Sequence, residues 1–505
     1  MIELIKKEKN FLLLTFFLSL AIKVIFFLIF LKNNSCLLMF DSGQYHKVAL
    51  NILSWTGQTN FYRMPGYPVF LAACYKIFGV HPIAALIMQI ILGSLIPLLV
   101  FALALVLFDK STFNSQIKTA KLASLVACFD LGYIIFPGLI MSEILFTMFF
   151  TLFLILFLYN YTPFFCKSPL LKTLRQPLRQ APSLRSELAS AGRQGERDEH
   201  TKEPARGELV EPFQRVLTFP ISRLFLAGIA LGIACLIRPV GHGLFLTSIF
   251  MLMVSKDKFF VKIKSIALFS TGLAFTLGIW IFRNFLLTGY IFMHTLSGPH
   301  FLNHSAVRLC MMDEKITYEQ AQKKVYAELK NLEPAKTNVL GKPLQEIEHC
   351  QLAEKLAISY MLKNPVLTVQ HFISNMLKTT FGLYSSELLV IDSGGQLPEY
   401  SNNRSIKSIF KRFLLPDVNN KFIIWVIYFE IIFFLFILLG LAIFIFISPI
   451  DRGKICTLIK TLPFICCLIF LTLSCGYARL RLPIESFLII LAIKEWQLLF
   501  SKKGE

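Results

Sequence analysis

The sequence is poor in charged residues and lacks the short motifs that identify many soluble enzymes. Asp, Glu, Lys and Arg make up 16% of the 505 residues, whereas ordinary soluble domains contain about 25%. The chain has no phosphate-binding glycine loop, no Ser/His/Asp order and no zinc signature. Its 11 cysteines form no C-x-x-C pair. These absences leave no support for a soluble nucleotide-binding or zinc-dependent enzyme.

What the sequence has in excess is apolar side chains. Hydrophobic residues make up 55% of the chain, 50 residues are phenylalanine, and the mean hydropathy is +0.62. The pattern predicts an all-α polytopic membrane protein with about ten transmembrane helices, since about 20 apolar residues cross a bilayer. The stretches lie at 11–31, 83–107, 120–139, 143–161, 222–237, 240–254, 265–282, 422–448, 460–476 and 484–500. Lys23 interrupts the first, and no cleavage site follows it, so we expect a retained span.

Lysine and arginine in the connections predict the orientation of these spans. Positive residues favour the cytoplasmic side, and basic segments alternate with the others at 1–10, 109–121, 255–264, 448–460 and 501–505. Both termini are therefore expected inside, and residues 32–82 and 283–421 outside. The net charge of +20 is spread over these loops and forms no single basic face, so we expect no nucleic-acid partner.

Two polar regions divide the chain. Residues 167–215 are rich in Arg, Glu, Pro and Ser and nearly free of aromatics, which predicts a disordered cytoplasmic insert within the transmembrane module 1–282. A regulatory docking segment is the alternative. Residues 283–421 carry apolar residues at helical spacing, which predicts a small external helical domain before the last transmembrane helices in 422–505. Cys310 and Cys350 lie in this domain, which leaves a disulfide between them open.

A short patterned helix follows the first span. Asp41 precedes an amphipathic stripe that is too short to cross a bilayer, formed by Tyr45, Val48, Ala49, Ile52 and Leu53. Asp41 can cap this helix, with Gln44 completing a capping box. Alternatively, it can hold a carboxylate at the membrane boundary, where it would act on a substrate carried by lipid. Arg63 and the proline-flanked turn 65–68 come next, and the turn starts another helix.

Four arginines lie where membrane proteins usually avoid them. Short external turns are normally poor in arginine, yet four fall at external ends of spans: Arg238, Arg283, Arg479 and Arg481. Each alone could reach lipid headgroups. Together they indicate a phosphate or pyrophosphate site, because the guanidinium fork suits phosphate. Glu143 opens a span near the same level and adds a carboxylate to this face.

Taken in order, several of these segments resemble a known family. An external D-x-x-x-Y-x-x-x-A helix from Asp41 is followed by R-x-P-G-Y-P from Arg63, SEILF, LAGIALGIACLIRP, WIFRN and R-L-R-L-P from Arg479. This order resembles the class C (GT-C) glycosyltransferases of the family 39 type, which include protein mannosyltransferase-like, aminoarabinose transferase-like and RgtA/B/C/D-like bacterial enzymes. The resemblance covers most of residues 1–290 and the last pair of spans, whereas 167–215 and 283–421 have no counterpart.

The resemblance implies a GT-C-type bundle in the bacterial inner membrane with its active site facing the exterior. It implies transfer of a hexose or pentose from a polyprenyl-phosphate donor to lipid A or core, a cell-surface glycan or a protein. The catalytic carboxylates would be Asp41 and Glu143. Substrate would be bound by Tyr45, Arg63, Tyr67, Arg238, Arg283, Arg479 and Arg481. This chain departs from the pattern in having Asp41 alone where some relatives carry two acids, and in having Glu at position 143.

The sequence assigns no metal ligands and leaves a divalent cation open. His300 and His304 are four residues apart, but the stretch SGPHFLNHS looks like a loop, so no metal site is expected there.

Two other classes of function remain. A lipid-linked oligosaccharide flippase or other transporter would use buried charges such as Lys23, Asp130 and Glu430 along its path. The same charges could instead pair with one another, and the repeated halves of many transporters are not seen. An O-antigen polymerase or ligase would share the arginines and the external domain, but would not require the acid at Asp41.

Overall fold

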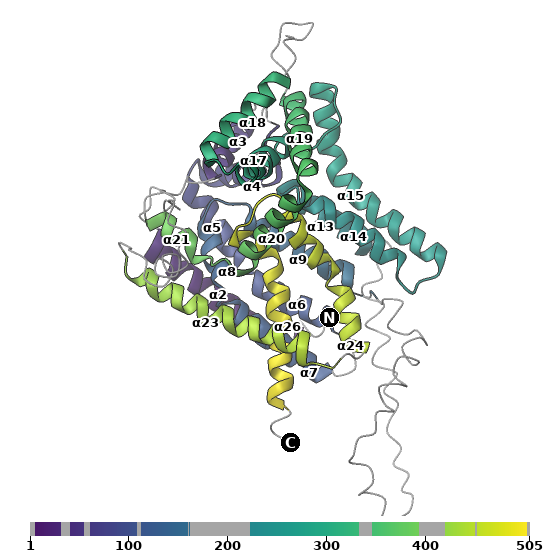
Figure 1. The fold of residues 1–505 in the computed structure, drawn as a ribbon. Helices are drawn as coiled ribbons and strands as arrows, with labels where there is room; N and C mark the ends of the chain where they lie inside the picture. Colours follow the sequence, from purple (N-terminus) through teal and green to yellow (C-terminus); the bar gives the residue numbers. More distant parts are fainter. Residues whose placement is uncertain are drawn as a thin grey trace, which may run out of the picture.

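The computed structural model describes residues 6–31, 41–54, 61–108, 113–159, 161, 223–332, 346–392, 420–449 and 452–501. Its regular structure there is helical (Figure 1). The first half contains α2 (Lys9–Phe26), η1 (Phe27–Leu31), α3 (Ser42–Leu53), α4 (Gly66–Phe78), α5 (Pro82–Gly93), α6 (Ile96–Leu107), α7 (Phe113–Ala127), α8 (Leu131–Ile135), η4 (Phe136–Gly138) and α9 (Glu143–Leu158). The predicted insert at 167–215 lies outside the described residues.

The second half begins with α13 (Arg223–Ile237), α14 (Gly241–Met253) and α15 (Phe259–Thr288). The region predicted to be external follows as α16 (Ser297–Phe301), η6 (Leu302–Ala306), α17 (Val307–Glu314), α18 (Tyr318–Leu332), α19 (Glu346–Lys363), α20 (Pro365–Phe381) and α21 (Ser385–Asp392). The chain ends with α23 (Phe422–Ala442), η7 (Ile443–Ile447), α24 (Arg452–Lys460), α25 (Leu462–Thr472), η8 (Ala478–Arg481) and α26 (Leu482–Ser501).

Five helical segments in the described part are long and apolar enough to cross a membrane, or six if the bent pair α7 and α8 counts as one span. The membrane class is confirmed by these helices, but the predicted number of about ten is not. The difference arises because several apolar runs form helices of 10–17 residues, among them α9, α13 and α14. Pro239, in the turn between α13 and α14, cannot continue a helix, so these two runs stay short.

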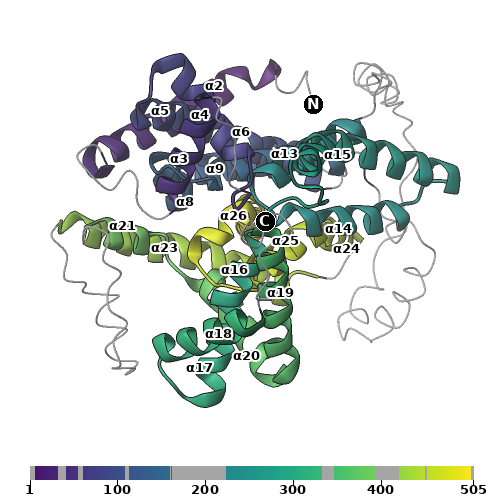
Figure 2. The ribbon, with the colours of Figure 1, turned by 90° about the horizontal axis from the view of Figure 1, so that it is seen from above.

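The transmembrane part is built around α26 and α9. Seen from above, α26 lies at the centre, with α2 to α9 on one side and α13 to α15 on another (Figure 2). Phenylalanines spaced along α9 fill the interior: Phe150 stacks edge-on against Phe464, and Phe153 and Phe157 contact Phe269. Close packing of large rings replaces the hydrophobic effect as a source of helix association inside a lipid bilayer.

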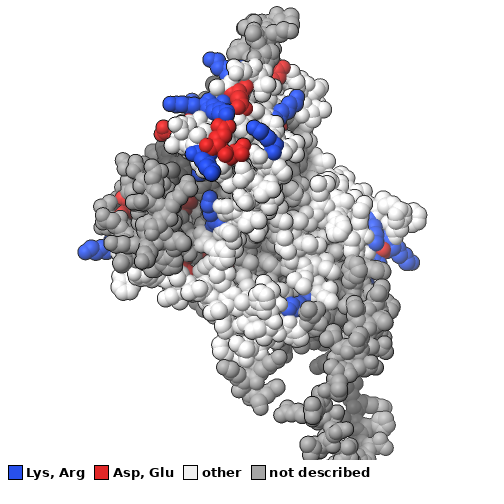
Figure 3. Space-filling model, in the orientation of Figure 1, with Lys and Arg blue, Asp and Glu red and all other residues white. Residues whose placement is uncertain are grey.

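The helices from α16 to α19 have a small hydrophobic core of their own. Its buried members include Leu302, Val307, Val325 and Leu356. The helical content expected for 283–421 is thus found in its described part, although α15 runs on to Thr288, past the expected boundary at 282. Cys310 and Cys350 are both buried free thiols. On the face shown in Figure 3, charged side chains gather over this end of the molecule, and the surface below carries fewer and more scattered ones.

Candidate active site

The carboxylate of Asp41 is held by Arg63. Arg63 Nη2 donates to Asp41 Oδ1 at 2.7 Å, and its Nε donates to Gln44 Oε1 at 2.8 Å. The helix α3 begins after Asp41 as predicted, but the predicted capping box is wrong, because the Asp41 side chain makes no capping hydrogen bond. The two side chains of the expected box turn instead to one guanidinium. Capping therefore does not explain why an acid stands at this position.

The turn at 65–68 brings Arg63 to the rest of the site. A Cβ at Gly66 would lie 2.7 Å from the carbonyl oxygen of Leu236, so only glycine allows α4 to start this close to the end of α13. Arg238 lies just beyond that end. Tyr67 donates from its hydroxyl to Gln89 Oε1 at 2.7 Å, and Gln89 Nε2 donates to Leu139 O at 2.7 Å. This chain of hydrogen bonds fixes the turn that leads into Glu143.

Glu143 lies between two arginines. Its Oε1 is 3.2 Å from Arg238 Nη1 and 3.9 Å from Arg479 Nε. The side chain is only 3% exposed and stands at the first position of α9, where the helix dipole favours negative charge. The other oxygen, Oε2, is buried and makes no hydrogen bond within the described residues. Glu143 therefore holds two guanidinium groups in place while keeping one acceptor unused.

Arg479 closes the arrangement by reaching both acids. Its Nη2 is 3.8 Å from Asp41 Oδ2, and it belongs to η8, far along the chain from Asp41. Three guanidinium groups thus meet two carboxylates: ion pairs join Arg63 to Asp41, Asp41 to Arg479, Arg479 to Glu143 and Glu143 to Arg238, and these five side chains are called the ring below. The ring thus holds three guanidinium groups, which stay protonated in proteins, against two carboxyl groups, and Glu387 is a third acid that acts on Arg479.

Electrostatics keep Asp41 ionised. Burial alone would raise the pKa of this carboxyl, but the charges of Arg63 and Arg479 and the hydrogen bond from Arg63 outweigh it, so the pKa is lowered. Burial would lower the pKa of Arg479, but Glu143, Glu387 and Asp41 raise it overall. The site therefore holds fixed charges of both signs at neutral pH. Asp41 remains 35% exposed, which makes it the open member of the ring.

Two donors in this ring lack good hydrogen bonds. Arg238 Nη1 and Arg479 Nε are buried, and within the described part of the chain neither makes a hydrogen bond of acceptable geometry, although both lie within ion-pair distance of Glu143. Unsatisfied buried donors are rare in proteins and point to a bound water or ion or to a functional role.

The structure brings six of the nine predicted site residues into this arrangement. Besides the ring, Tyr45 contributes its ring beneath Arg63, with 5.1 Å from Arg63 Cζ to the ring centroid, and its hydroxyl lies 3.4 Å from Ser142 Oγ. Tyr67 stacks edge-on against Tyr45 and takes a supporting place behind it. Arg283 and Arg481 make their contacts elsewhere.

Arg283 and Arg481 have aromatic and carboxylate partners outside the ring. Arg283 lies 4.6 Å from the ring centroid of Trp280 and donates to Asn284 Oδ1 at 2.9 Å. Arg481 pairs with Glu485 and donates to the carbonyl oxygen of Gly382 at 3.0 Å. Their position at external span ends suggested one shared anion, but neighbouring residues along a short helix point in different directions. Arg479 and Arg481, two apart in η8, illustrate this.

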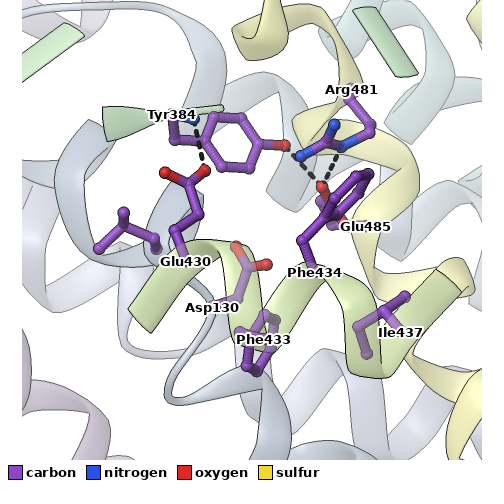
Figure 4. A pocket seen from close by; sticks show the side chains of 9 residues that line it. Asp130, Tyr384, Glu430, Phe433, Phe434, Ile437, Arg481 and Glu485 are labelled. Atoms are coloured by element: carbon purple, nitrogen blue, oxygen red, sulfur yellow. Dashed lines mark hydrogen bonds and ion pairs between the residues drawn. The ribbon is translucent and has the colours of Figure 1, made fainter. Parts of the chain in front are cut away.

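Arg481 belongs to a second buried cluster (Figure 4). Asp130, Tyr384, Glu430, Arg481 and Glu485 line a small pocket between α8, α21, α23 and α26. Asp130 accepts a hydrogen bond from Tyr133 N at 3.0 Å and so caps α8, while Glu430 accepts from Ser385 N at 2.8 Å. These acids thus have structural partners, as has Lys23, which donates to Ser19 Oγ at 2.5 Å.

Glu387, near the ring, was not found from the sequence, and His300 and His304 were considered there only as possible metal ligands. Glu387 in α21 raises the pKa of Arg479, and burial raises the pKa of Glu387 itself. His300 and His304 lie with ring centroids 4.5 Å apart and sense the charge of Asp41. Burial, aided by His304, lowers the pKa of His300 to about 3, so it is neutral. The expectation of a loop here is wrong, since the stretch is helical in α16 and η6. The i, i+4 spacing of the histidines was the usable signal.

No group of three or more His, Cys, Asp or Glu side chains among the described residues is arranged to hold a metal ion. The polar groups at the ring are mainly guanidinium donors, which suit an anion and repel a cation.

Comparisons with known proteins give structural likeness only. No protein-family model matches the chain, and no curated protein matches it. The oligosaccharyltransferase AglB from Archaeoglobus fulgidus, in complex with an inhibitory peptide and a dolichol-phosphate, is 12% identical, with a TM-score of 0.46 over 99% of this chain and 51% of that one. An apo form of the Archaeoglobus fulgidus oligosaccharyltransferase is 13% identical, with a TM-score of 0.37 over 98% and 51%.

ArnT from Cupriavidus metallidurans, in the apo state, is 11% identical, with a TM-score of 0.30 over 86% of this chain and 72% of that one. These are proteins of the class that the sequence motifs resemble. The chain spans about half the length of the archaeal oligosaccharyltransferase. At this level of likeness, activities, substrates and partners do not transfer from those proteins to this chain.

Proposed function

We propose that this chain is a membrane glycosyltransferase that moves a sugar from a polyprenyl-phosphate donor to an acceptor hydroxyl group. The observation that carries the proposal is the placement of Arg479 between the partly exposed carboxylate of Asp41 and Glu143, with Arg238 paired to the same Glu143. Sugar transfer from a lipid phosphate requires positive charge to stabilise the leaving phosphate and a base to take the acceptor proton. The arginines and Asp41 of the ring would supply them.

The chemistry follows from the charges. The acceptor oxygen forms a bond to the anomeric carbon of the sugar and gives its proton to Asp41. The bond between that carbon and the phosphate oxygen breaks, and the phosphate leaves on its lipid with the electron pair. Arg238 and Arg479 stabilise the negative charge that develops on the leaving oxygen. Glu143 holds both arginines in position before the donor binds.

The lowered pKa of Asp41 is compatible with this role. A carboxylate held by Arg63 is a weak base towards a resting hydroxyl, but the acceptor oxygen becomes strongly acidic as its bond to carbon forms. When the donor phosphate pairs with Arg479, the positive charge of Arg479 stabilises the Asp41 carboxylate less. The pKa of Asp41 then rises, and the carboxylate becomes more basic. The donor thereby activates the base that serves the acceptor.

Several finer points belong to this proposal. The sugar would be a hexose or a pentose, and the acceptor lipid A or core, a surface glycan or a protein. The enzyme would reside in the bacterial inner membrane with the ring on the external side, among membrane lipids and next to its lipid-linked donor. Asp41 would be the catalytic base, Glu143 the residue that positions the arginines, and Tyr45, Arg63, Arg238 and Arg479 would contact substrate.

The test is sugar transfer in proteoliposomes supplied with synthetic polyprenyl-phosphate hexoses and pentoses. Release of free polyprenyl phosphate is measured for the wild type and for Asp41→Asn. Because Asn keeps the shape of the side chain but cannot take a proton, release should fall by about 10²-fold or more. The matched control is Asp313→Asn, an exposed acid in the external helices that bonds Asn364, and it should leave release unchanged. Undiminished release in Asp41→Asn would remove the base from the mechanism.

A further inference from the structure

The helix α20 is turned inside out relative to a helix in water. Its buried side chains are all polar: His371, Asn375 and Thr379. Its exposed side includes Gln370 and Lys378 but consists mainly of large apolar side chains, each between 45% and 69% exposed: Val366, Val369, Ile373, Leu377 and Phe381. A helix at the surface of a soluble domain has the opposite arrangement, with apolar residues inside and polar residues outside.

The neighbouring helix α18 shows that the arrangement is specific to α20. In α18 the buried residues are Ala321, Val325 and Leu329, and the exposed face carries charges such as Glu319 and Lys323. Both helices belong to the region that the sequence assigned to one external domain. Since α18 has the pattern expected for water and α20 the reverse, the two helices face different surroundings.

The polar side of α20 is committed to the protein. Ser474 O lies 3.3 Å from His371 Nε2, and Asn375 Nδ2 lies 3.2 Å from the same ring nitrogen. A Cβ at Gly476 would lie 2.4 Å from Asn375 O, which shows how closely the backbone of the 473–477 segment approaches the helix. Rotating α20 to bury its apolar face would break these contacts. The contacts of the polar side therefore keep the apolar face of α20 directed outward.

The surface next to this face is part of a candidate membrane span. α20 packs on α25, part of the candidate span Gly453–Thr472, and α25 exposes apolar side chains of its own, including Ile465, Ile469 and Phe470. Figure 1 shows α20 where the external helices meet the bundle. The apolar face of α20 thus continues the lipid-facing surface of a span.

We infer that α20 lies against the lipid acyl chains of the membrane, as a lipid-embedded element and not as part of a water-exposed external domain. Lipid explains why the described residues provide no cover for a face of five large apolar side chains, and why His371 and Asn375 point inward, where they find partners. With 17 residues, α20 is about 25 Å long, and it is not among the helices that meet the criteria for a span.

The inference bears on the ring of charges through η8. Arg481 Nη1 donates to the carbonyl oxygens of Thr379, at 3.2 Å, and Gly382, at 3.0 Å, at the end of α20. Arg479 stands two residues before Arg481 in the same short helix. A lipid-embedded α20 would place Arg479 at the membrane boundary, where a lipid-borne phosphate arrives. The inference itself does not depend on the proposed function and is tested without any sugar donor.

The experiment is site-specific photocrosslinking of the full chain in phosphatidylethanolamine and phosphatidylglycerol vesicles. p-Benzoylphenylalanine replaces Val369 or Ile373 in α20. It replaces Ile432, 69% exposed in the candidate span α23, as the lipid-facing reference, and Ala327, exposed on α18, as the water-facing reference. After irradiation the protein mass is measured. We expect a mass increase of one phospholipid at Val369, Ile373 and Ile432, and none at Ala327.

Two outcomes would overturn the inference. One is an adduct of twice the protein mass at Val369 and Ile373, which would show that a second copy covers α20. The other is no lipid adduct at these positions while Ile432 gives one, which would show that the face meets water. A second measurement guards against misfolding of a labelled variant. Ile373→Asp should lower the Tm in vesicles and Ala327→Asp should not, whereas an unchanged Tm for Ile373→Asp contradicts a lipid-facing position.

Discussion

Arg63 holds Asp41 by a charged hydrogen bond of 2.7 Å from Nη2 to Oδ1. The two residues lie 22 positions apart, on either side of α3, and the contact replaces the helix cap that the local sequence suggests. The consequence is an acid whose side chain is fixed in direction and whose pKa is lowered. Several predictions about activity and stability depend on this pair and on the residues that surround it.

Replacing Arg63 by Gln should shift the pH dependence of transfer. Arg63 is the largest of the influences that lower the pKa of Asp41, so its loss raises that pKa. Asp41 must be deprotonated to take the acceptor proton. The acidic limb of the rate profile should therefore move to higher pH in Arg63→Gln, so that activity is lost earlier as pH falls. Rates measured from acid to neutral pH check this. As a control, Lys324→Gln, in an exposed ion pair with Glu314, should leave the limb in place.

Replacing Arg479 by Gln should slow the chemical step more than it weakens donor binding. Loss of a charged donor to the leaving oxygen costs about 10²–10³-fold in kcat. Arg481→Gln is the matched comparison, because that side chain points to Glu485 and away from the ring. Arg481→Gln should change kcat little when the rate is expressed per amount of folded protein. Equal losses of kcat in the two variants would show that η8 acts only as a structural element.

Arg481→Gln should instead act on stability. Arg481 and Glu485 are 2% and 3% exposed, and removing one partner leaves the other charge buried without a counter-ion. The cost of breaking such a pair is about 3–5 kcal/mol. Unfolding in detergent, followed by fluorescence, should show a large fall in Tm. The exposed pair of Lys324 and Glu314 supplies the contrast, since Lys324→Gln should cost at most about 1 kcal/mol.

Gly66→Ala should destabilise the protein by forcing α4 away from α13. The added Cβ would meet the Leu236 carbonyl oxygen at 2.7 Å, and overpacking of this kind costs about 1–3 kcal/mol. Gly278→Ala is the control, because a Cβ there would meet nothing within 4 Å. Alanine at position 278 should raise stability slightly, since alanine is the better helix former. A Tm for Gly66→Ala equal to that of the wild type would show that this contact is not tight.

The helices themselves could be predicted well from local pattern. The stripe after Asp41 gave α3 with the correct start, and the apolar runs gave the class of fold, because burial in lipid requires backbone hydrogen bonds within each segment. Counting spans was less successful. Whether two apolar runs form one span or two short helices depends on breaks such as the one at Pro239, and on how the pieces pack.

The direction of single side chains was the harder question. Arg479 and Arg481 look equivalent in the sequence, yet one meets Asp41 and Glu143 and the other Glu485. Glu387 was missed because nothing in its surroundings along the chain sets it apart. Gln44 was expected to complete a cap and instead accepts from Arg63. In each case the partner comes from a distant segment, so local spacing carries no information about it.

The sequence alone determined that this chain enters a membrane, that helices carry its backbone through it, and that arginines and acids concentrate near one end of those helices. These follow from hydropathy and from periodicity, which act over a few turns. Only the tertiary structure decided which charges meet. Contacts such as Arg479 with Asp41, or the polar face of α20 with the 473–477 segment, join residues a hundred or more positions apart, and their geometry depends on how whole helices pack.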